Sequence, residues 1–170
     1  MAAAATAAVK FKINSTLSNT IGLGTTSSLA EFLYTASLAS GTGADQINKV
    51  WTSDDRSIAA SSSETHDVAG GLTDALGATV TMTKVKGIAI KAASTNTNNV
   101  VVGGATSNGL VNWVGDATDV INIRPGGCLV LIAPDSTGYA VTAGTGDLLK
   151  ISNSSSGTPV VYDIALLGVG

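Results

Sequence analysis

The sequence predicts an all-β protein, namely an antiparallel β-sandwich that is jelly-roll-like and has an extended N-terminal arm. About eight to ten short segments either alternate between apolar and polar residues or are apolar throughout, as β-strands do. Turn-forming residues separate these segments roughly every eight to twelve positions. No long helical pattern alternates with them, so an antiparallel sandwich or jelly roll is favoured over a parallel α/β fold.

Length and composition fit a single domain with an arm in front of it. The chain has 170 residues, of which 44% are hydrophobic, 12% charged and 4% aromatic. This length supports one compact core but not a second full domain. We therefore expect residues 1–20 to form an N-terminal arm and first strand, and residues 21–170 to form a single β-sandwich domain.

Strict alternation predicts the first strand. Val9, Phe11 and Ile13 are separated by polar residues, which places the three apolar side chains on one face of a half-buried strand. Residues 1–8 ahead of them are small and nearly featureless, as expected for an extended arm. The apolar segment at residues 29–39 fits both strand and helical spacing, so both assignments stay open.

The middle of the chain combines an aromatic anchor with short strands. Trp51 is expected in the core or in a subunit contact. Residues 72–77 are expected to form one helical turn that ends at Gly77. Further strands are expected in the segments at residues 45–51, 56–60, 84–91 and 98–104.

The pattern is most regular after residue 118. Residues 119–123 alternate, residues 128–133 are apolar throughout, and three more strands follow. Between the first two, RPGG resembles a phosphate-binding loop, but Pro125 and Gly126 meet the backbone requirements of a type II turn. We therefore expect a hairpin here, with Cys128 buried and inert at the start of its second strand.

No motif indicates catalysis. His66 is the single histidine and lies beside Glu64 and Asp67 in a polar segment. These groups would bind a cation only weakly, and an exposed strand edge explains them better. The nucleophile elbow, the zinc-protease motif, the dinucleotide fingerprint and the Walker A loop are missing. We expect no enzymatic activity, no cofactor, no metal and no small-molecule substrate.

Charge argues against nucleic acid as a partner. The net charge is −3, the isoelectric point is about 4.8, and the nine basic residues are scattered. Lys84 and Lys86 are two positions apart, which predicts a solvated strand face. No stretch approaches the roughly 18 apolar residues of a membrane span, and no signal peptide is recognisable. We expect a protein made in the cytoplasm that binds no membrane.

The order of motifs after residue 55 carries a family resemblance. The segments are AGGLTDALGATVTMTKVKGIAIK, GDATDVINIRPGG, GYAVTAGTGDLLKISN and YDIALLG. Together they resemble small β-rich virion proteins of tailed bacteriophages, in particular capsid cement or decoration proteins. The resemblance covers roughly residues 56–168.

The resemblance implies a jelly-roll-like domain, often trimeric, on the outer surface of the phage capsid. There it would bridge subunits of the major capsid protein after being made in the host cytoplasm. It carries over no catalytic residue. One alternative is a tail, fibre or adsorption module that binds host carbohydrate through Trp51, Trp113 or Tyr139. Another is a small hydrolase with a scattered Ser/Asp site.

Six residues are candidates for contacts with partners. An arm or edge strand is able to add to a neighbour's sheet, which nominates apolar side chains of the first strand. The two tryptophans and one arginine at a turn complete the set. The candidates are Val9, Phe11, Ile13, Trp51, Trp113 and Arg124. A homotrimer would also place apolar residues of the final strands near its axis.

Overall fold

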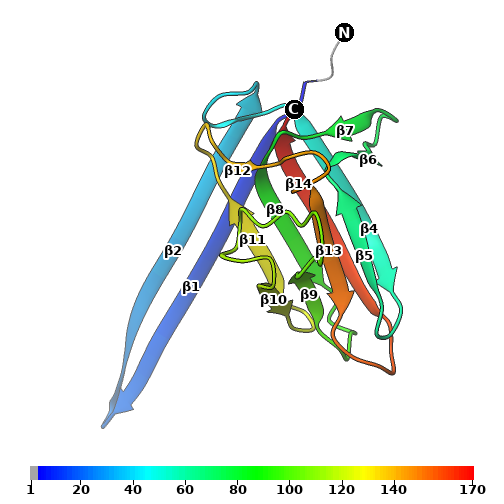
Figure 1. Ribbon diagram of the computed structural model, residues 1–170. Helices are drawn as coiled ribbons and strands as arrows, with labels where there is room; N and C mark the ends of the chain where they lie inside the picture. Colours follow the sequence, from blue (N-terminus) through cyan, green and yellow to red (C-terminus); the bar gives the residue numbers. More distant parts are fainter. Residues whose placement is uncertain (1–3) are drawn as a thin grey trace.

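The computed structural model describes residues 4–170, and all regular secondary structure in this range is β. The predicted fold class is confirmed, because the strands form an antiparallel β-sandwich (Figure 1). A long hairpin diverges from the sandwich and extends past its lower end. Residues 1–3 of the predicted arm lie outside the described residues.

The described part of the chain contains fourteen strands, which vary widely in length. They are β1 (Ala7–Ile21), β2 (Gly24–Ser40), β3 (Gln46–Ile47), β4 (Lys49–Ile58), β5 (Ser63–Asp67), β6 (Ala69–Thr73), β7 (Thr79–Thr81), β8 (Lys84–Ala92), β9 (Val100–Gly103), β10 (Val120–Ile123), β11 (Cys128–Ile132), β12 (Tyr139–Ala140), β13 (Leu148–Asn153) and β14 (Val160–Val169).

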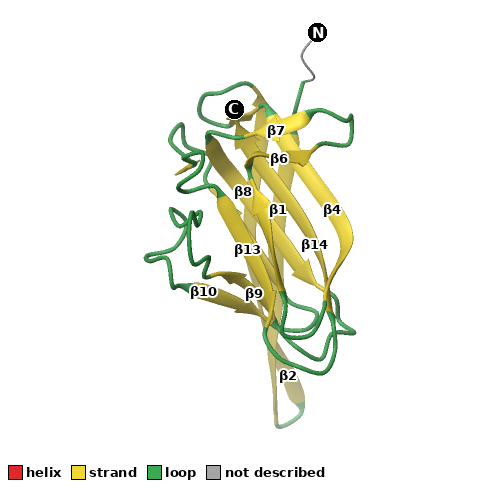
Figure 2. Cartoon of the chain, turned by 45° about the vertical axis from the view of Figure 1, so that its right-hand side comes forward, coloured by secondary structure: helices red, strands yellow, loops and turns green. Residues whose placement is uncertain are grey.

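Two sheets form the sandwich. The first has the order β11-β8-β14-β4, with β12 also pairing with β8, and the second has the order β10-β9-β13-β5. All pairings within these two sheets are antiparallel. The short strands β6 and β7 form a separate hairpin at the upper end (Figure 2).

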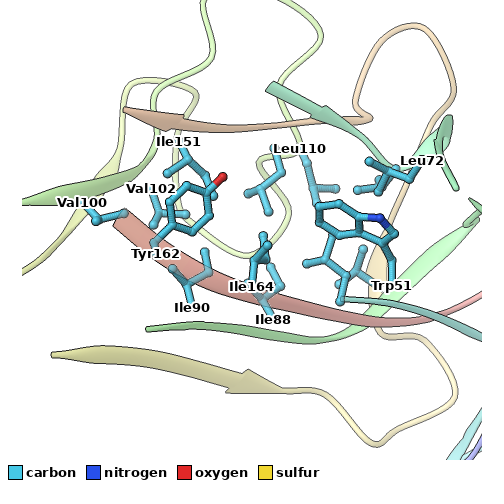
Figure 3. Packing of buried hydrophobic residues seen from close by; sticks show 14 of the residues in the cluster. Trp51, Leu72, Ile88, Ile90, Val100, Val102, Leu110, Ile151, Tyr162 and Ile164 are labelled. Atoms are coloured by element: carbon cyan, nitrogen blue, oxygen red, sulfur yellow. The ribbon is translucent and has the colours of Figure 1, made fainter. Parts of the chain in front are cut away.

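The core lies between the two sheets (Figure 3). Along β14 and β13 every second side chain is buried, which is the period expected of strands with one face against a core. Tyr162, Ile88 and Ile151 are fully buried there. Trp51 is also buried, with 7% of its surface exposed, so of its two predicted places, the core or a subunit contact, the structure shows the core.

Strands that follow each other in the chain often lie in different sheets, which corrects the hairpin predicted at RPGG. β10 belongs to the second sheet and β11 to the first, so the RPGG turn carries the chain across the sandwich. Its local chemistry is as predicted: Gly126 has φ of 75°, and the Gly127 amide donates to the Arg124 carbonyl at 2.8 Å. The segment between β13 and β14 crosses in the same way.

Two further local predictions are wrong, and one alternative that was left open is decided. Residues 29–39 lie within β2, so the strand assignment holds there and the helical one does not. Residues 72–77 contain no helical turn; β6 ends at Thr73, and a turn follows in which the Asp74 carboxylate accepts hydrogen bonds from the Leu76 and Ala78 amides, both at 2.9 Å. Cys128 is exposed rather than buried, because its side chain faces outward from the sandwich.

The diverging hairpin is formed by β1 and β2. Their register runs without a bulge from Ala7 opposite Leu38 to Ile21 opposite Gly24. Gly22 has φ of 61° in the two-residue turn between them, where a residue without Cβ avoids strain. The last residues of β2 pair in parallel with β3, which joins the hairpin to the body of the protein.

Candidate interaction surface

The hairpin has one apolar face. Side chains alternate between the two faces of a strand, so Phe11, Ile13 and Leu17 of β1 lie on the same side. In the register, Tyr34 is opposite Phe11 and Phe32 is opposite Ile13. The rings of Phe11 and Phe32 meet edge to face, with centroids 6.2 Å apart. The apolar face of the hairpin is defined here as Val9, Phe11, Ile13, Leu17, Ile21, Ala30, Phe32, Tyr34 and Ala36.

The opposite face of the hairpin is mixed. It carries Lys10 and an ion pair between Lys12 Nζ and Glu31 Oε2, which lie 2.6 Å apart on opposite strands. Leu29 and Leu33 are also on this face. All three charges of the hairpin therefore lie on this one side, and the apolar face carries none.

The outer face of the first sheet is apolar as well. Cross-strand pairing puts Val130, Ala89, Ala165 and Thr52 in one row across four strands. The row above it consists of Ile132, Gly87, Leu167 and Val50. Below them, Cys128, Lys91 and Asp163 form a more polar row, in which Lys91 Nζ lies 3.3 Å from Asp163 Oδ2.

A wedge-shaped groove separates the hairpin from this sheet face. Near the hairpin base it holds a cavity of about 330 Å³, where Val9 and Phe11 face Ala89, Val130 and Leu167. A second cavity of about 550 Å³ lies alongside, with Phe32 and Tyr34 on the hairpin side and β11 on the other. The term groove is used below for this space, with the apolar face of the hairpin as one wall and the outer sheet face as the other.

Lys86 fixes the base of the hairpin. Its side chain is fully buried, and Nζ donates to the Gly43 carbonyl at 2.7 Å and to the Pro134 carbonyl at 3.3 Å. The prediction of a solvated face is therefore wrong for Lys86, because the loop at residues 41–45 covers it. The same loop holds the end of β2: the Ala39 amide donates to the Asp45 carbonyl at 2.8 Å.

A buried polar network links the two sheets. Tyr162 of β14 donates its hydroxyl proton to Glu64 Oε1 at 2.6 Å, and the same hydroxyl lies 2.8 Å from His66 Nε2. Because the tyrosine proton is committed to Glu64, Nε2 of His66 is the donor in the second hydrogen bond. Arg56 of β4 binds Glu64 through Nε and through a second guanidinium nitrogen.

The network sets the protonation of its members. Burial lowers the pKa of His66 to about 4, so this imidazole is neutral at pH 7. Burial and the hydrogen bond to Glu64 raise the pKa of Tyr162 above its usual range. Burial alone would raise the pKa of Glu64, but hydrogen bonds from Arg56 and Tyr162 outweigh it and leave that pKa lowered.

The position of His66 corrects its predicted exposure. Only 3% of its surface is exposed, and its ring centroid lies 5.0 Å from that of Trp51. The alternation of β5 places His66 toward the core, opposite Leu149 of β13. The arrangement is a hydrogen-bond chain between the sheets, in which a neutral His66 and the Arg56–Glu64 ion pair meet at the Tyr162 hydroxyl, and it stabilises the sandwich.

The six predicted contact residues fall into two groups. Val9, Phe11 and Ile13 lie together on the apolar face of the hairpin, the last two with 40% and 50% of their surface exposed. The others do not join them. Trp51 is in the core, Trp113 is half-buried and donates Nε1–H to the Leu110 carbonyl at 2.8 Å, and Arg124 is exposed at its turn.

Sequence reasoning missed most of this surface. Ile21 and Phe32 continue the apolar face beyond residues 1–20, and Leu17 continues it beyond the alternating residues 9–13. The alternation that identified Val9, Phe11 and Ile13 does extend, with gaps at Ser15 and Asn19. The outer sheet face was missed because its small residues, such as Ala89 and Ala165, also fit a sheet that is covered on both sides.

Comparison with family models, with curated proteins and with solved structures gives no match. Across residues 4–170, no helix is long and apolar enough to cross a membrane. The same residues contain no group of three or more His, Cys, Asp or Glu side chains placed to hold a metal ion.

Proposed function

We propose that this chain is a structural virion protein, a capsid cement or decoration protein that binds the outer surface of a tailed-phage head and bridges major capsid protein subunits. One observation carries the proposal. Of the eleven large hydrophobic side chains that are exposed in residues 4–170, eight lie on the β1–β2 hairpin. A projecting element that concentrates apolar surface in this way is suited to contacts between protein subunits.

The amount of apolar surface supports this role. At roughly 200 Å² of accessible surface for each large side chain, the eight hairpin residues expose about 1,000 Å². The five of these residues on the apolar face, Phe11, Ile13, Leu17, Ile21 and Phe32, expose about 600 Å², the upper end of the roughly 300–600 Å² of the largest apolar patch on a typical soluble monomer. Exposing this apolar surface to water has a free-energy cost, and an isolated two-stranded hairpin is only marginally stable. A permanent partner removes that cost.

The winding of the sandwich supports the jelly-roll-like part of the proposal. Eight strands divide into two antiparallel groups of four, β4-β14-β8-β11 and β5-β13-β9-β10, and the chain repeatedly crosses between them. Two interlocked Greek keys of eight strands define a jelly roll. This architecture provides a rigid body from which the hairpin extends.

On this proposal the mechanism is mechanical. Each contact between the hairpin and a neighbouring subunit buries apolar surface, at about 25 cal/mol per Å². Separating shell subunits would then require exposing that surface again. Because symmetry repeats the contact around the shell, modest individual contacts add up to a large resistance to internal pressure.

The direct test is binding to a shell. The full chain is mixed with expanded shells assembled from the major capsid protein of the same phage, and the shells are sedimented. We expect saturable binding at the outer surface and a higher temperature of shell disruption. Failure of the chain to co-sediment with expanded shells would exclude the proposed function.

The carbohydrate-binding alternative has less structural support. Trp51, one of the three aromatic side chains named for a sugar site, lies in the core. Trp113 is half-buried, and its indole nitrogen is already bonded to the Leu110 carbonyl. A glycan screen with the intact chain, run beside the shell assay, separates the two roles.

A further inference from the structure

We propose that the groove is occupied by a second copy of this chain, so that the apolar face of one copy's hairpin covers the outer sheet face of the next copy. The inference deepens the proposed function and rests on it for its structural role, but self-association is measurable without a shell. It specifies which two surfaces meet when the protein forms its oligomer.

Each chain carries both of the surfaces that would meet in this contact. The hairpin provides an apolar wall that extends beyond its own sandwich (Figure 1). The outer sheet face provides rows of small apolar side chains, including Val130, which is 41% exposed. The hairpin wall is exposed over most of its length, whereas the sheet wall is exposed at Val130 and half-buried at Ala89 and Ala165, and a second copy would cover both.

The hairpin of a chain does not fold down onto the outer sheet face of the same chain. The end of β2 is held by the hydrogen bond from Ala39 to Asp45, and the Gly41 amide donates to the Ile47 carbonyl at 2.9 Å. Leu38 and Ile47 are buried at this junction, with 2% and 0% of their surface exposed. These contacts fix the direction in which the hairpin leaves the body, and the two walls diverge toward the tip.

The hairpin also exposes enough apolar surface for a stable contact between two chains. Phe11, Ile13, Leu17, Ile21 and Phe32 together expose about 600 Å², at roughly 200 Å² for a fully accessible side chain. The smaller members of the apolar face bring the total near the roughly 800 Å² per partner that a stable interface buries. The hairpin is therefore large enough to hold two copies together by itself.

Charge also favours contact between the hairpin and another copy. The hairpin carries two lysines and one glutamate, which gives it a net charge of +1. The remainder of the chain carries seven basic and eleven acidic residues, a net charge of −4. The net charges of the two parts are therefore opposite in sign, and no charged side chain of the hairpin has to enter the apolar contact.

The contact is heterologous, because a hairpin meets a sheet face rather than another hairpin. Contacts of this type close into a ring when the rotation between copies permits it. A ring of three, which the family resemblance implies, would leave every hairpin and every sheet face covered. Within it, Ala165 and Leu167 of β14 are the apolar residues of the final strand that would be covered.

The first experiment measures association of the full chain by sedimentation velocity. Leu17→Lys places a charge on the hairpin wall, and Val130→Lys places one on the sheet wall. The matched control is Leu76→Lys, because Leu76 is as exposed as Leu17, at 78% against 77%, but lies in the β6–β7 turn. We expect an oligomer for the wild type and the control, and at least about 30-fold weaker association for each groove variant.

The second experiment identifies which surfaces meet. Cys128 is the only cysteine and lies on the outer sheet face, so it serves as a built-in attachment point. A variant with Leu17→Cys and Cys128→Ser is mixed with wild type and treated with a short bismaleimide. Each chain then has one thiol, so a mixed dimer arises only between copies, and it is the expected product.

The other outcomes distinguish failure of this inference from failure of the proposed function. A wild-type monomer at high micromolar concentration excludes a second copy as the occupant. If Leu17→Lys and Val130→Lys then lose shell binding, the occupant is the capsid shell. Cross-linking confined to Leu17→Cys pairs would show hairpins packed on hairpins. Normal association without shell binding would instead remove the proposed function and leave this inference standing.

Discussion

Tyr162 is the residue on which the buried network depends. It belongs to β14 at the centre of the first sheet, while Glu64 and His66 belong to β5 at the edge of the second. Its hydroxyl is the single atom that both partners contact. The two sheets are thus joined by directional hydrogen bonds as well as by apolar packing.

Removing this hydroxyl should destabilise the protein. In Tyr162→Phe, Glu64 loses a donor and His66 loses an acceptor, both inside the sandwich. We expect the free energy of unfolding in urea to fall by about 1–3 kcal/mol. Tyr139→Phe is the control, since Tyr139 is half-buried and its hydroxyl forms no side-chain hydrogen bond in residues 4–170. Equal stability of the two variants would contradict the account.

His66 predicts how stability depends on pH. Its pKa is about 4 in the folded protein and about 6.5 when unfolded, so the unfolded chain binds the proton more readily. The free energy of unfolding should therefore fall as the pH is lowered from 6.5 toward 4, by about 2–3 kcal/mol in total. The lowered pKa of Glu64 acts in the same direction, but only at more acidic pH.

The variant His66→Gln isolates this contribution. Glutamine does not titrate, so the loss between pH 6.5 and about 4.5 should largely disappear while the steeper loss at lower pH remains. Urea unfolding across this range measures the difference. Parallel pH profiles for wild type and variant would show that His66 is not the group responsible.

Single residues also show where sequence patterns stop being informative. For Trp51 the sequence was enough to predict a place in the core or in a subunit contact, and the structure shows it in the core. His66 was not predictable, because its polar neighbours in sequence suggest exposure while its partner Tyr162 is 96 residues away. The cover over Lys86 comes from residues 43 positions earlier in the chain.

At the scale of elements, local turn chemistry and strand pairing are separate questions. Pro125 and Gly126 determine the shape of the turn, and that shape was predicted correctly. Whether β10 and β11 then pair depends on β9 and β8, which hold them in different sheets. Likewise, residues 29–38 lie in a strand because residues 7–16 of β1 pair with them one for one. The sheet to which a strand belongs, and the partner that makes a segment a strand, are not determined by the sequence of that segment alone.

The hairpin base offers a test at this scale. Lys86→Met keeps the length of the side chain but removes the donor to the Gly43 carbonyl inside the structure. We expect looser attachment of the loop and about tenfold faster hydrogen exchange at the Ala39 and Gly41 amides.

Lys84→Met is the matched control for this substitution. Lys84 is two positions earlier in the same strand, and its Nζ donates to the Ser136 carbonyl at 2.8 Å in an exposed position. Its removal should leave the exchange of both amides unchanged. Similar exchange in the two variants would mean that Lys86 does not secure the base.

For the whole molecule, periodicity was sufficient to predict an antiparallel sandwich, because burying one face of each strand requires a second layer. The length and direction of the hairpin were not predictable. They follow from pairing between two segments whose patterns are individually interrupted, and from an anchor that forms only in the folded chain. The apolar faces that remain uncovered are the main reason to regard the protein as part of an assembly.

The central claim is that a second copy covers the groove, and the reactivity of Cys128 tests it most directly. Cys128 is exposed on the sheet wall of a single copy. We predict that its alkylation rate falls at least about tenfold from low to high micromolar protein concentration, by mass action, and stays fast in Leu17→Lys. A fast rate in the wild type that does not change with concentration would contradict the account.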